Sequence, residues 1–430
     1  MNILLLGSGG REHAIASKIA QSALCDTLYI APGNAGMAAC GTLVPQLDMN
    51  DFQAVDSYVL GNKIEMVVVG PEAPLVNGIA DHFAADPKLS QVMLIGPGRQ
   101  GAMLEGSKDY AKAFMMRHNI PTARYQTFTA DTLAEGERFL ESLKAPYVLK
   151  ADGLAAGKGV LIDPDLATAK AHLREMLDGK FGSASASVVI EEYLSGIELS
   201  VFVLTDGQHY LLLPSAKDYK RIGEGDTGLN TGGMGSVSPV PFADKEFMRK
   251  VEERIVKPTV RGLREEKIPY CGFLFLGLMN CGGDPYVIEY NVRMGDPETE
   301  SVFPRLKSDV VELFQNAARG TLDRCVLKVD ERTAACVMMV AGGYPESYRK
   351  GDPIDLGTEA DGVQLFHCGT KRGDDGQLLT NGGRVMCATA LANTLPEALL
   401  KSYNRVGTVH WNDQYYRRDI GQDLLKLLVG

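Results

Sequence analysis

One short segment carries a carboxylate, an amide and a guanidinium at every second position. Between residues 287 and 293, apolar side chains alternate with Glu289, Asn291 and Arg293. Residues two apart on a β-strand point to the same face, so a strand here would present all three groups together. Carboxylate and amide oxygens suit Mg2+, and an arginine can bind a carboxylate or phosphate that the metal also touches. The pattern predicts a nucleotide phosphate beside an acidic substrate.

A second candidate phosphate site is the run from Lys150 to Gly159. A lysine at a strand end can reach nucleotide phosphates, and a loop of small residues lets backbone amides close over them. Gly157 and Lys158 nearly meet the Walker A spacing, but Gly159 replaces the serine or threonine and a strand is expected to follow. A flexible hairpin without a ligand is the alternative.

The first glycine-rich turn follows the first predicted strand and contains Gly9, Gly10 and Arg11. Backbone N–H groups at a helix N-terminus can bind an anion there, and Arg11 favours a phosphate. Glu12 stands where a dinucleotide fingerprint requires glycine, which disfavours NAD. A tight turn without a ligand is the alternative.

Three acidic positions and one loop have weaker signals. Glu72 ends another predicted strand, where it can accept hydrogen bonds from sugar hydroxyls or an amine, or simply stabilise a helix N-terminus. Glu191 leaves a strand and Glu198 follows it, so they could bind adenosine, although a solvated acidic turn fits the sequence alone better. The loop 217–235 combines glycines with basic residues, which suits either anion recognition or a surface loop.

These side chains require elements to position them. Apolar runs at 3–6, 28–31, 66–69 and 92–95 each end in a glycine or proline turn and predict a Rossmann-like parallel sheet in an α/β domain at 1–104. An α+β core is expected at 105–325, with a mobile lid at about 122–192, a long helix at 245–266 and a hairpin of strands 272–280 and 286–293. A small strand-rich domain at 326–430 completes the prediction.

Composition narrows the class of protein. The chain has 430 residues, 45% of them hydrophobic and 23% charged, and a net charge of −10, which argues against nucleic acid as a partner. Its eight cysteines include no CxxC pair, so neither a zinc site nor a disulfide framework is indicated. The absence of a long apolar run predicts no membrane span, and a cytoplasmic location is expected.

Taken in order, the motifs resemble the glycinamide ribonucleotide synthetase family of the ATP-grasp superfamily. The matching words include GSGGREHA (7–14), PGNAG (32–36), GPEAPL (70–75), LEGSK (104–108), KADGLAAGKGV (150–160), EEYL (191–194), DTGLNTGGMG (226–235), IEYNVRMGDPET (288–299) and TNGGRV (380–385). Two positions depart from the family pattern: Tyr219 stands where histidine is common, and Leu229 replaces a common proline. The resemblance covers essentially the full length.

The resemblance implies an enzyme of de novo purine biosynthesis that uses ATP and Mg2+ (or Mn2+). It implies ligation of glycine to 5-phosphoribosylamine through glycyl phosphate, with glycinamide ribonucleotide, ADP and phosphate as products, and a monomer. The alternatives are another ATP-grasp carboxylate–amine ligase or a non-catalytic nucleotide-binding regulator. Strand 272–280 contains no acid, so the metal would have one charged protein ligand.

The resemblance also implies roles for individual residues. The metal ligands would be Glu289 and Asn291. Residues binding ATP would be Lys108, Lys150, Gly157, Lys158, Gly159, Glu191, Tyr193, Leu194 and Glu198. Glycine and its acyl phosphate would meet Arg293, Asp218 and Lys220 as catalytic residues, beside the turn Asp296, Pro297 and Glu298. Phosphoribosylamine would meet Gly9, Gly10, Arg11, Glu72 and Arg384.

Overall fold

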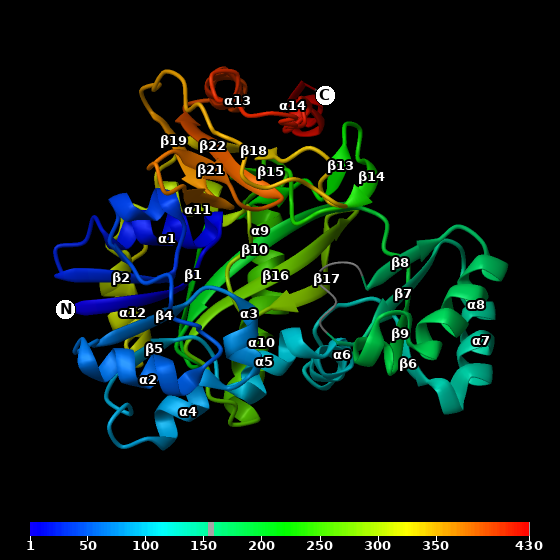
Figure 1. Ribbon diagram of the computed structural model, residues 1–430. Coiled ribbons are helices and arrows are strands. Elements are labelled where there is room, and N and C mark those ends of the chain that lie inside the picture. Colours follow the sequence, from blue (N-terminus) through cyan, green and yellow to red (C-terminus); the bar gives the residue numbers. More distant parts are fainter. Residues whose placement is uncertain (154–158, 430) are drawn as a thin grey trace.

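A computed structural model describes residues 1–153 and 159–429 (Figure 1). Its N-terminal part contains a five-stranded parallel sheet. The sheet has the order β3-β2-β1-β4-β5, and all its pairings are parallel. Its strands are β1 (Asn2–Gly7), β2 (Thr27–Pro32), β3 (Thr42–Leu43), β4 (Met66–Val69) and β5 (Met93–Ile95). The predicted Rossmann-like sheet is confirmed, and only the two-residue edge strand β3 was not predicted.

The apolar runs became strands because both faces of this sheet are packed. Ile3, Leu4, Leu5 and Leu6 of β1 have no exposed surface, as expected for a strand buried on both sides. The helices that follow the strands are α1 (Gly10–Ile19), α2 (Phe52–Gly61), α3 (Glu72–Val76), α4 (Ile79–Ala85) and α5 (Arg99–Gly106).

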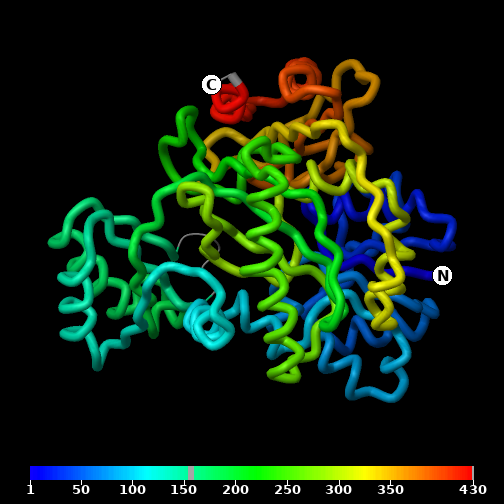
Figure 2. The backbone as a smooth tube through the Cα atoms, turned by 180° about the vertical axis from the view of Figure 1, so that it is seen from behind, coloured from blue at the N-terminus to red at the C-terminus, as the bar shows by residue number. Residues whose placement is uncertain are grey.

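A smaller unit projects to one side of the molecule, as Figures 1 and 2 both show. It contains the antiparallel sheet β6-β9-β7-β8 and has its own hydrophobic core, with Phe128, Leu149 and Ile190 among its members. Its elements are β6 (Tyr125–Thr129), α7 (Leu133–Glu141), β7 (Tyr147–Ala151), β8 (Val160–Asp163), α8 (Leu166–Glu175) and β9 (Ser187–Glu192). Helix α6 (Lys108–Arg117), capped by Ser107, leads into it.

The central sheet carries the hairpin predicted from the alternating segment. Its antiparallel order is β11-β10-β16-β17, with β10 (Ile197–Thr205), β11 (Tyr210–Leu212), β16 (Gly272–Cys281) and β17 (Asp284–Asn291). The predicted long helix consists of α9 (Lys245–Val251) and α10 (Lys257–Glu265), joined by a π turn at Glu252–Val256.

The third sheet combines strands from two distant parts of the chain. Its order is β12-β15-β18-β22-β19; β12 (Lys217–Asp218) begins the predicted loop 217–235, and β15 (Gly235–Ser238) starts at its last residue. The other members are β18 (Thr333–Val340), β19 (Val363–His367) and β22 (Arg384–Ala392). A loop was predicted at 217–235 and both strands were missed. Strand β12 pairs with β15, and β15 pairs with β18, which lies about a hundred residues further along the chain.

The remaining elements surround these sheets. Two small hairpins pair β13 (Arg221–Gly223) with β14 (Thr227–Asn230) and β20 (Thr370–Arg372) with β21 (Leu378–Thr380). The last helices are α11 (Thr299–Val302), α12 (Val310–Ala318), α13 (Leu395–Val406) and α14 (Gln422–Val429). In the described residues, no helix combines the length and apolar character that crossing a membrane requires.

Candidate active site

Strand β17 ends at Asn291, two residues earlier than the sequence predicted. Its register with β16 shifts between Gly277 and Leu278, so Glu289 lies opposite Gly277 and Asn291 opposite Phe275. The pairing stops because the N–H of Val292 donates to the Glu105 carboxylate at 2.8 Å. The expectation that Arg293 belongs to the strand is therefore wrong, and Arg293 occupies the turn that follows.

Arg293 nevertheless stays close to Asn291, because two carboxylates and the Asn291 amide hold its side chain. Its guanidinium lies 2.8 Å from Glu105 and 3.3 Å from Glu72, and it donates to Asn291 Oδ1 at 3.2 Å. Burial raises the pKa of Glu105 and Arg293 only partly offsets the rise. For Glu72, burial is outweighed by Arg293 and Arg11, and the pKa lies below its usual value. Sequence reasoning missed Glu105, whose one signal was its place in the word LEGSK.

The predicted nucleotide lysines surround a buried carboxylate. Glu191 is 4% exposed, and its Oε2 lies 3.0 Å from the Lys150 amine and 3.2 Å from the Lys112 amine. Lys108 donates to the carbonyl oxygens of Ala151 at 2.7 Å and Gly153 at 3.3 Å. Lys112 was missed, although it lies one helical turn after Lys108 and so on the same face of α6.

Burial changes the electrostatics of this lysine cluster. It lowers the pKa of Lys112 to about 8, with Glu191 acting in the opposite direction. It also lowers the pKa of Lys108, while the charge of Glu289 opposes the change. The second oxygen of Glu191, Oε1, is buried and has no hydrogen-bond partner among residues 1–153 and 159–429. An acceptor left unpaired in this way is costly, so it marks a place for an N–H or O–H donor from a ligand.

The remaining predicted ATP contacts lie beside the cluster. Tyr193 is exposed and Leu194 half-buried in the connection between β9 and β10, and Glu198 of β10 pairs with Lys220 at 2.7 Å. The carbonyl of Gly159 accepts from the Ala151 N–H at 2.7 Å. Gly157 and Lys158 lie outside the described residues.

Asp218 and Glu298 form an acidic pair near Lys220. Burial raises the pKa of Asp218, and Lys220 only partly offsets this. Burial, followed by the charge of Asp218, raises the pKa of Glu298 to about 7. Ser200 donates to Glu298 at 3.0 Å and holds its carboxyl group in place. A buried carboxyl group with a pKa near neutrality among other charged groups is typical of sites that move protons.

The turn at Asp296 joins the first glycine loop to the third sheet. Arg384 pairs with the Asp296 carboxylate at 2.9 Å and donates to its carbonyl at 2.9 Å. The Arg11 N–H approaches the same carboxylate at 3.4 Å, and the Arg11 guanidinium pairs with Glu12 at 2.5 Å. Pro297 packs against Gly233, where an added Cβ would lie 2.3 Å from the proline ring. Residues 11, 296 and 384 thus meet in one place.

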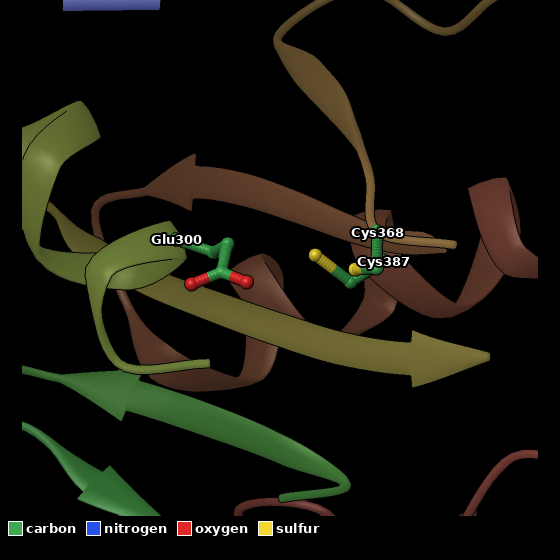
Figure 3. A group of neighbouring side chains, drawn as sticks. All are labelled: Glu300, Cys368 and Cys387. Atoms are coloured by element: carbon green, nitrogen blue, oxygen red, sulfur yellow. The ribbon is translucent and has the colours of Figure 1, made fainter. Parts of the chain in front are cut away.

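Gly10 lies against a buried carboxylate that sequence reasoning missed. A Cβ at Gly10 would lie 2.2 Å from Glu300 Oε1 and 2.8 Å from Cys368 Sγ. Figure 3 shows Glu300 directed towards Cys368 and Cys387, and the ligand atoms of the three lie within 4.8 Å of one another. Thiols are poor ligands for Mg2+, so this group is a weaker candidate for the magnesium site than the predicted Glu289 and Asn291.

Three family models match the chain in succession. The phosphoribosylglycinamide synthetase N domain matches residues 1–105, its ATP-grasp (A) domain residues 106–299, and its C domain residues 334–423. The chain belongs to the phosphoribosylglycinamide synthetase family. The family resemblance predicted from the sequence motifs is therefore confirmed.

Similar proteins extend this family assignment over the whole length. Phosphoribosylamine–glycine ligases from Escherichia coli strain K12 and Vibrio cholerae are each 46% identical, with 98% of both chains covered. The solved structure of phosphoribosylamine–glycine ligase from Thermotoga maritima is 36% identical, with a TM-score of 0.84 over 98% of this chain and 100% of that one. Biotin carboxylase from Campylobacter jejuni, 13% identical over 96% of this chain and 92% of that one, shares the fold with a TM-score of 0.70.

Proposed function

We propose that the residues described above carry out the reaction of this family, the ATP-dependent ligation of glycine to 5-phosphoribosylamine. The activity follows from family membership and from full-length relatives named phosphoribosylamine–glycine ligase. The observation that carries the residue assignment is the position of Arg293, held by Glu72 and Glu105 beside the strand end that bears Glu289 and Asn291. Anion-binding and metal-binding groups meet there.

ATP is assigned to the cleft between the lid at about 122–192 and the central sheet. Lys108 and Lys150 bind its phosphates together with Gly157, Lys158 and Gly159. The unpaired Glu191 oxygen accepts from the adenine amine, Tyr193 and Leu194 lie along the base, and Glu198 accepts from the ribose. The buried, partnerless acceptor on Glu191 supports this orientation.

Glu289 and Asn291 hold Mg2+, or Mn2+ in its place. Both offer the hard oxygen ligands that these ions prefer, and the Asn291 oxygen that accepts from Arg293 has a second lone pair. The metal, when bound, neutralises charge on the transferred phosphoryl group. Strand β16 places Gly277, which has no side chain, opposite Glu289, so β16 would offer the metal no second charged ligand at this position.

Glycine lies between Arg293 and the Asp296-Pro297-Glu298 turn. Arg293 and Lys220 neutralise the carboxylate while one of its oxygens attacks the γ-phosphorus, ADP leaves, and glycyl phosphate forms. Asp218 and Glu298 face the α-amino group and bind it. Positioning and charge neutralisation supply the catalysis, and no protein nucleophile is required.

Phosphoribosylamine occupies the junction of the N-terminal and third sheets. Gly9, Gly10 and Arg11 with Arg384 hold its phosphate, and Glu72 accepts from its sugar hydroxyls. Its amine attacks the acyl carbon of glycyl phosphate, the acyl C–O bond breaks, phosphate leaves, and the amine proton passes to the nearby acidic groups. Glycinamide ribonucleotide is the product.

We propose in addition that the domains span 1–104, 105–325 and 326–430, and that the protein acts as a monomer in the cytoplasm. All eight cysteines belong to the described part of the chain and are free thiols, which supports a reducing compartment.

Release of ADP by purified protein tests the assignment. ADP is expected only when ATP, glycine and 5-phosphoribosylamine are all present with Mg2+. Equal turnover without glycine, or faster turnover with another amino acid, would favour a different carboxylate–amine ligase. Tight ATP binding with no ADP release under any combination would favour a regulator.

A further inference from the structure

The short strand β12 and the two residues after it present two opposite faces. The pairing of β12 with β15 continues beyond Asp218, because the Tyr219 N–H donates to the Gly235 carbonyl at 3.1 Å and the Tyr219 carbonyl accepts from Met234 at 2.7 Å. Alternate residues of extended chain point in opposite directions. Asp218 and Lys220 therefore face the site, while Lys217 and Tyr219 face away from it.

The side chains that face away from the site, Lys217 and Tyr219, contact the C-terminal helix α14. The Tyr219 hydroxyl donates to Asp423 Oδ1 at 2.5 Å, and the Lys217 amine lies 3.1 Å from Asp423 Oδ2. The Lys217 amine also lies 3.9 Å from the centre of the Tyr219 ring, close enough for a cation–π interaction. One carboxylate of α14 thus contacts both side chains on this face.

Arg417 also contacts the Tyr219 ring. Its side chain is 1% exposed, and its guanidinium carbon lies 5.4 Å from the Tyr219 ring centre. The guanidinium pairs with Asp226 at 2.7 Å and Asp419 at 2.7 Å, and it donates to the Arg221 carbonyl at 3.1 Å. Arg417 therefore ties both ends of the β13–β14 hairpin to the C-terminal segment.

We propose that residues 417–423, which we call the C-terminal brace, position Asp218 and Lys220 for the reaction, with Tyr219 and Asp423 as the positioning residues. The proposal rests on the function proposed for Asp218 and Lys220. Neither Tyr219 nor Asp423 touches substrate. Their contact fixes the backbone of residues 217–220, and thereby the positions of Asp218 and Lys220 on the opposite face. A displacement of about 1 Å in a group that holds a reactant is enough to cost a large factor in rate.

The electrostatics of the brace agree with this role. Burial alone would raise the pKa of Asp423, but Lys217 and the Tyr219 hydroxyl outweigh it and keep the pKa below its usual value. The carboxylate is therefore charged at neutral pH, and hydrogen bonds to charged groups are stronger than neutral ones. The charged Asp423 carboxylate therefore strengthens the contact that holds Lys217 and Tyr219 in place.

Four variants test the brace. Tyr219→Phe removes only the hydroxyl, and Asp423→Asn removes the charge; each is expected to lower kcat/KM for glycine about 10-fold. The double variant should be little worse than either single variant, since both break the same contact. Tyr415→Phe is the matched control, because the Tyr415 hydroxyl donates to the Ile222 carbonyl at 2.9 Å in the neighbouring hairpin, and it should retain normal activity.

A fifth variant, Asp218→Asn, tests the proposed function directly.

The outcomes are distinguishable. Assays run well below the thermal midpoints of all variants separate positioning from unfolding. If Tyr219→Phe and Asp423→Asn lower the midpoint but leave kcat/KM unchanged, the brace only stabilises the fold and the inference is overturned. If Tyr415→Phe lowers kcat/KM as much as they do, a specific role for Tyr219 and Asp423 is likewise overturned. If Asp218→Asn itself retains full activity, the role proposed for Asp218 fails first, whatever the brace variants do.

Discussion

The guanidinium of Arg293 lies 2.8 Å from the carboxylate of Glu105, and the same carboxylate accepts the Val292 N–H that ends strand β17. One buried acid thus ends β17, the strand that carries Glu289 and Asn291, and orients the arginine beyond it. Arg293 contacts Glu72 as well, so its direction is set by groups from two helices of the N-terminal half. The position of Arg293, the proposed anion-binding group, therefore depends on Glu105, which need not touch substrate.

Glu105→Gln should therefore lower kcat/KM for glycine by about 10- to 100-fold, because a neutral amide no longer holds the guanidinium. The glutamine can still accept from Val292, so the strand end should persist. Steady-state kinetics at varied glycine concentration measure the effect. Glu135→Gln, at an exposed surface ion pair with Arg138, serves as the control. Wild-type kinetics for Glu105→Gln would contradict the positioning role.

Glu289→Ala should abolish turnover while leaving the fold intact, because Glu289 is the one charged protein ligand proposed for the metal. The loss should exceed about 100-fold even at saturating Mg2+, with the circular dichroism spectrum unchanged. Asp284→Asn at the other end of β17 is the control, since the exposed Asp284 carboxylate pairs with Lys250 and Arg254 at the protein surface. Normal activity of Glu289→Ala at saturating Mg2+ would refute the metal assignment.

Glu298 should make stability depend on pH. Its pKa is raised from 4.5 to about 7 by burial and by Asp218. The folded protein therefore keeps a proton between these two values that the unfolded chain has lost, and stability falls as pH rises across this window. The contribution lost is roughly 3 kcal/mol.

Thermal melting at several pH values measures this effect. Glu298→Gln should flatten the decline between pH 4.5 and about 7, because an amide has no proton to lose. An unchanged pH profile in this variant would show that another group is responsible. Activity of the same variant reports separately on whether the carboxyl group is needed for the reaction.

Gly10→Ala should destabilise the protein by about 1–3 kcal/mol, as overpacking of a buried site does. The new methyl group would meet Glu300 and Cys368, which are both buried. Adding Glu300→Ala should restore part of the thermal midpoint. Gly61→Ala, with open space around the added Cβ, is the matched control and should be neutral. Equal midpoints for Gly10→Ala and the unmodified protein would contradict the packing account.

Local patterns were enough to predict several elements and part of the site. The apolar run that became β1 and the alternation in β17 are short-range signals. A strand buried on both faces requires a continuous apolar run, and a strand buried on one face requires apolar residues at every second position. The motifs in their order also identified the family, and the family models confirm it. The roles of Glu289 and Asn291 remain predictions.

Other features were decided only by tertiary structure. Glu105 reaches Arg293 across 188 residues of sequence, β15 pairs with β18, and Tyr219 meets Asp423 at the far end of the chain. Periodicity shows which face of an element is buried, but carries no information about which distant residue covers it. The sequence by itself determined the family, the parallel sheet and the hairpin of β16 and β17; folding decided which charged groups face one another, because those contacts depend on packing between distant segments.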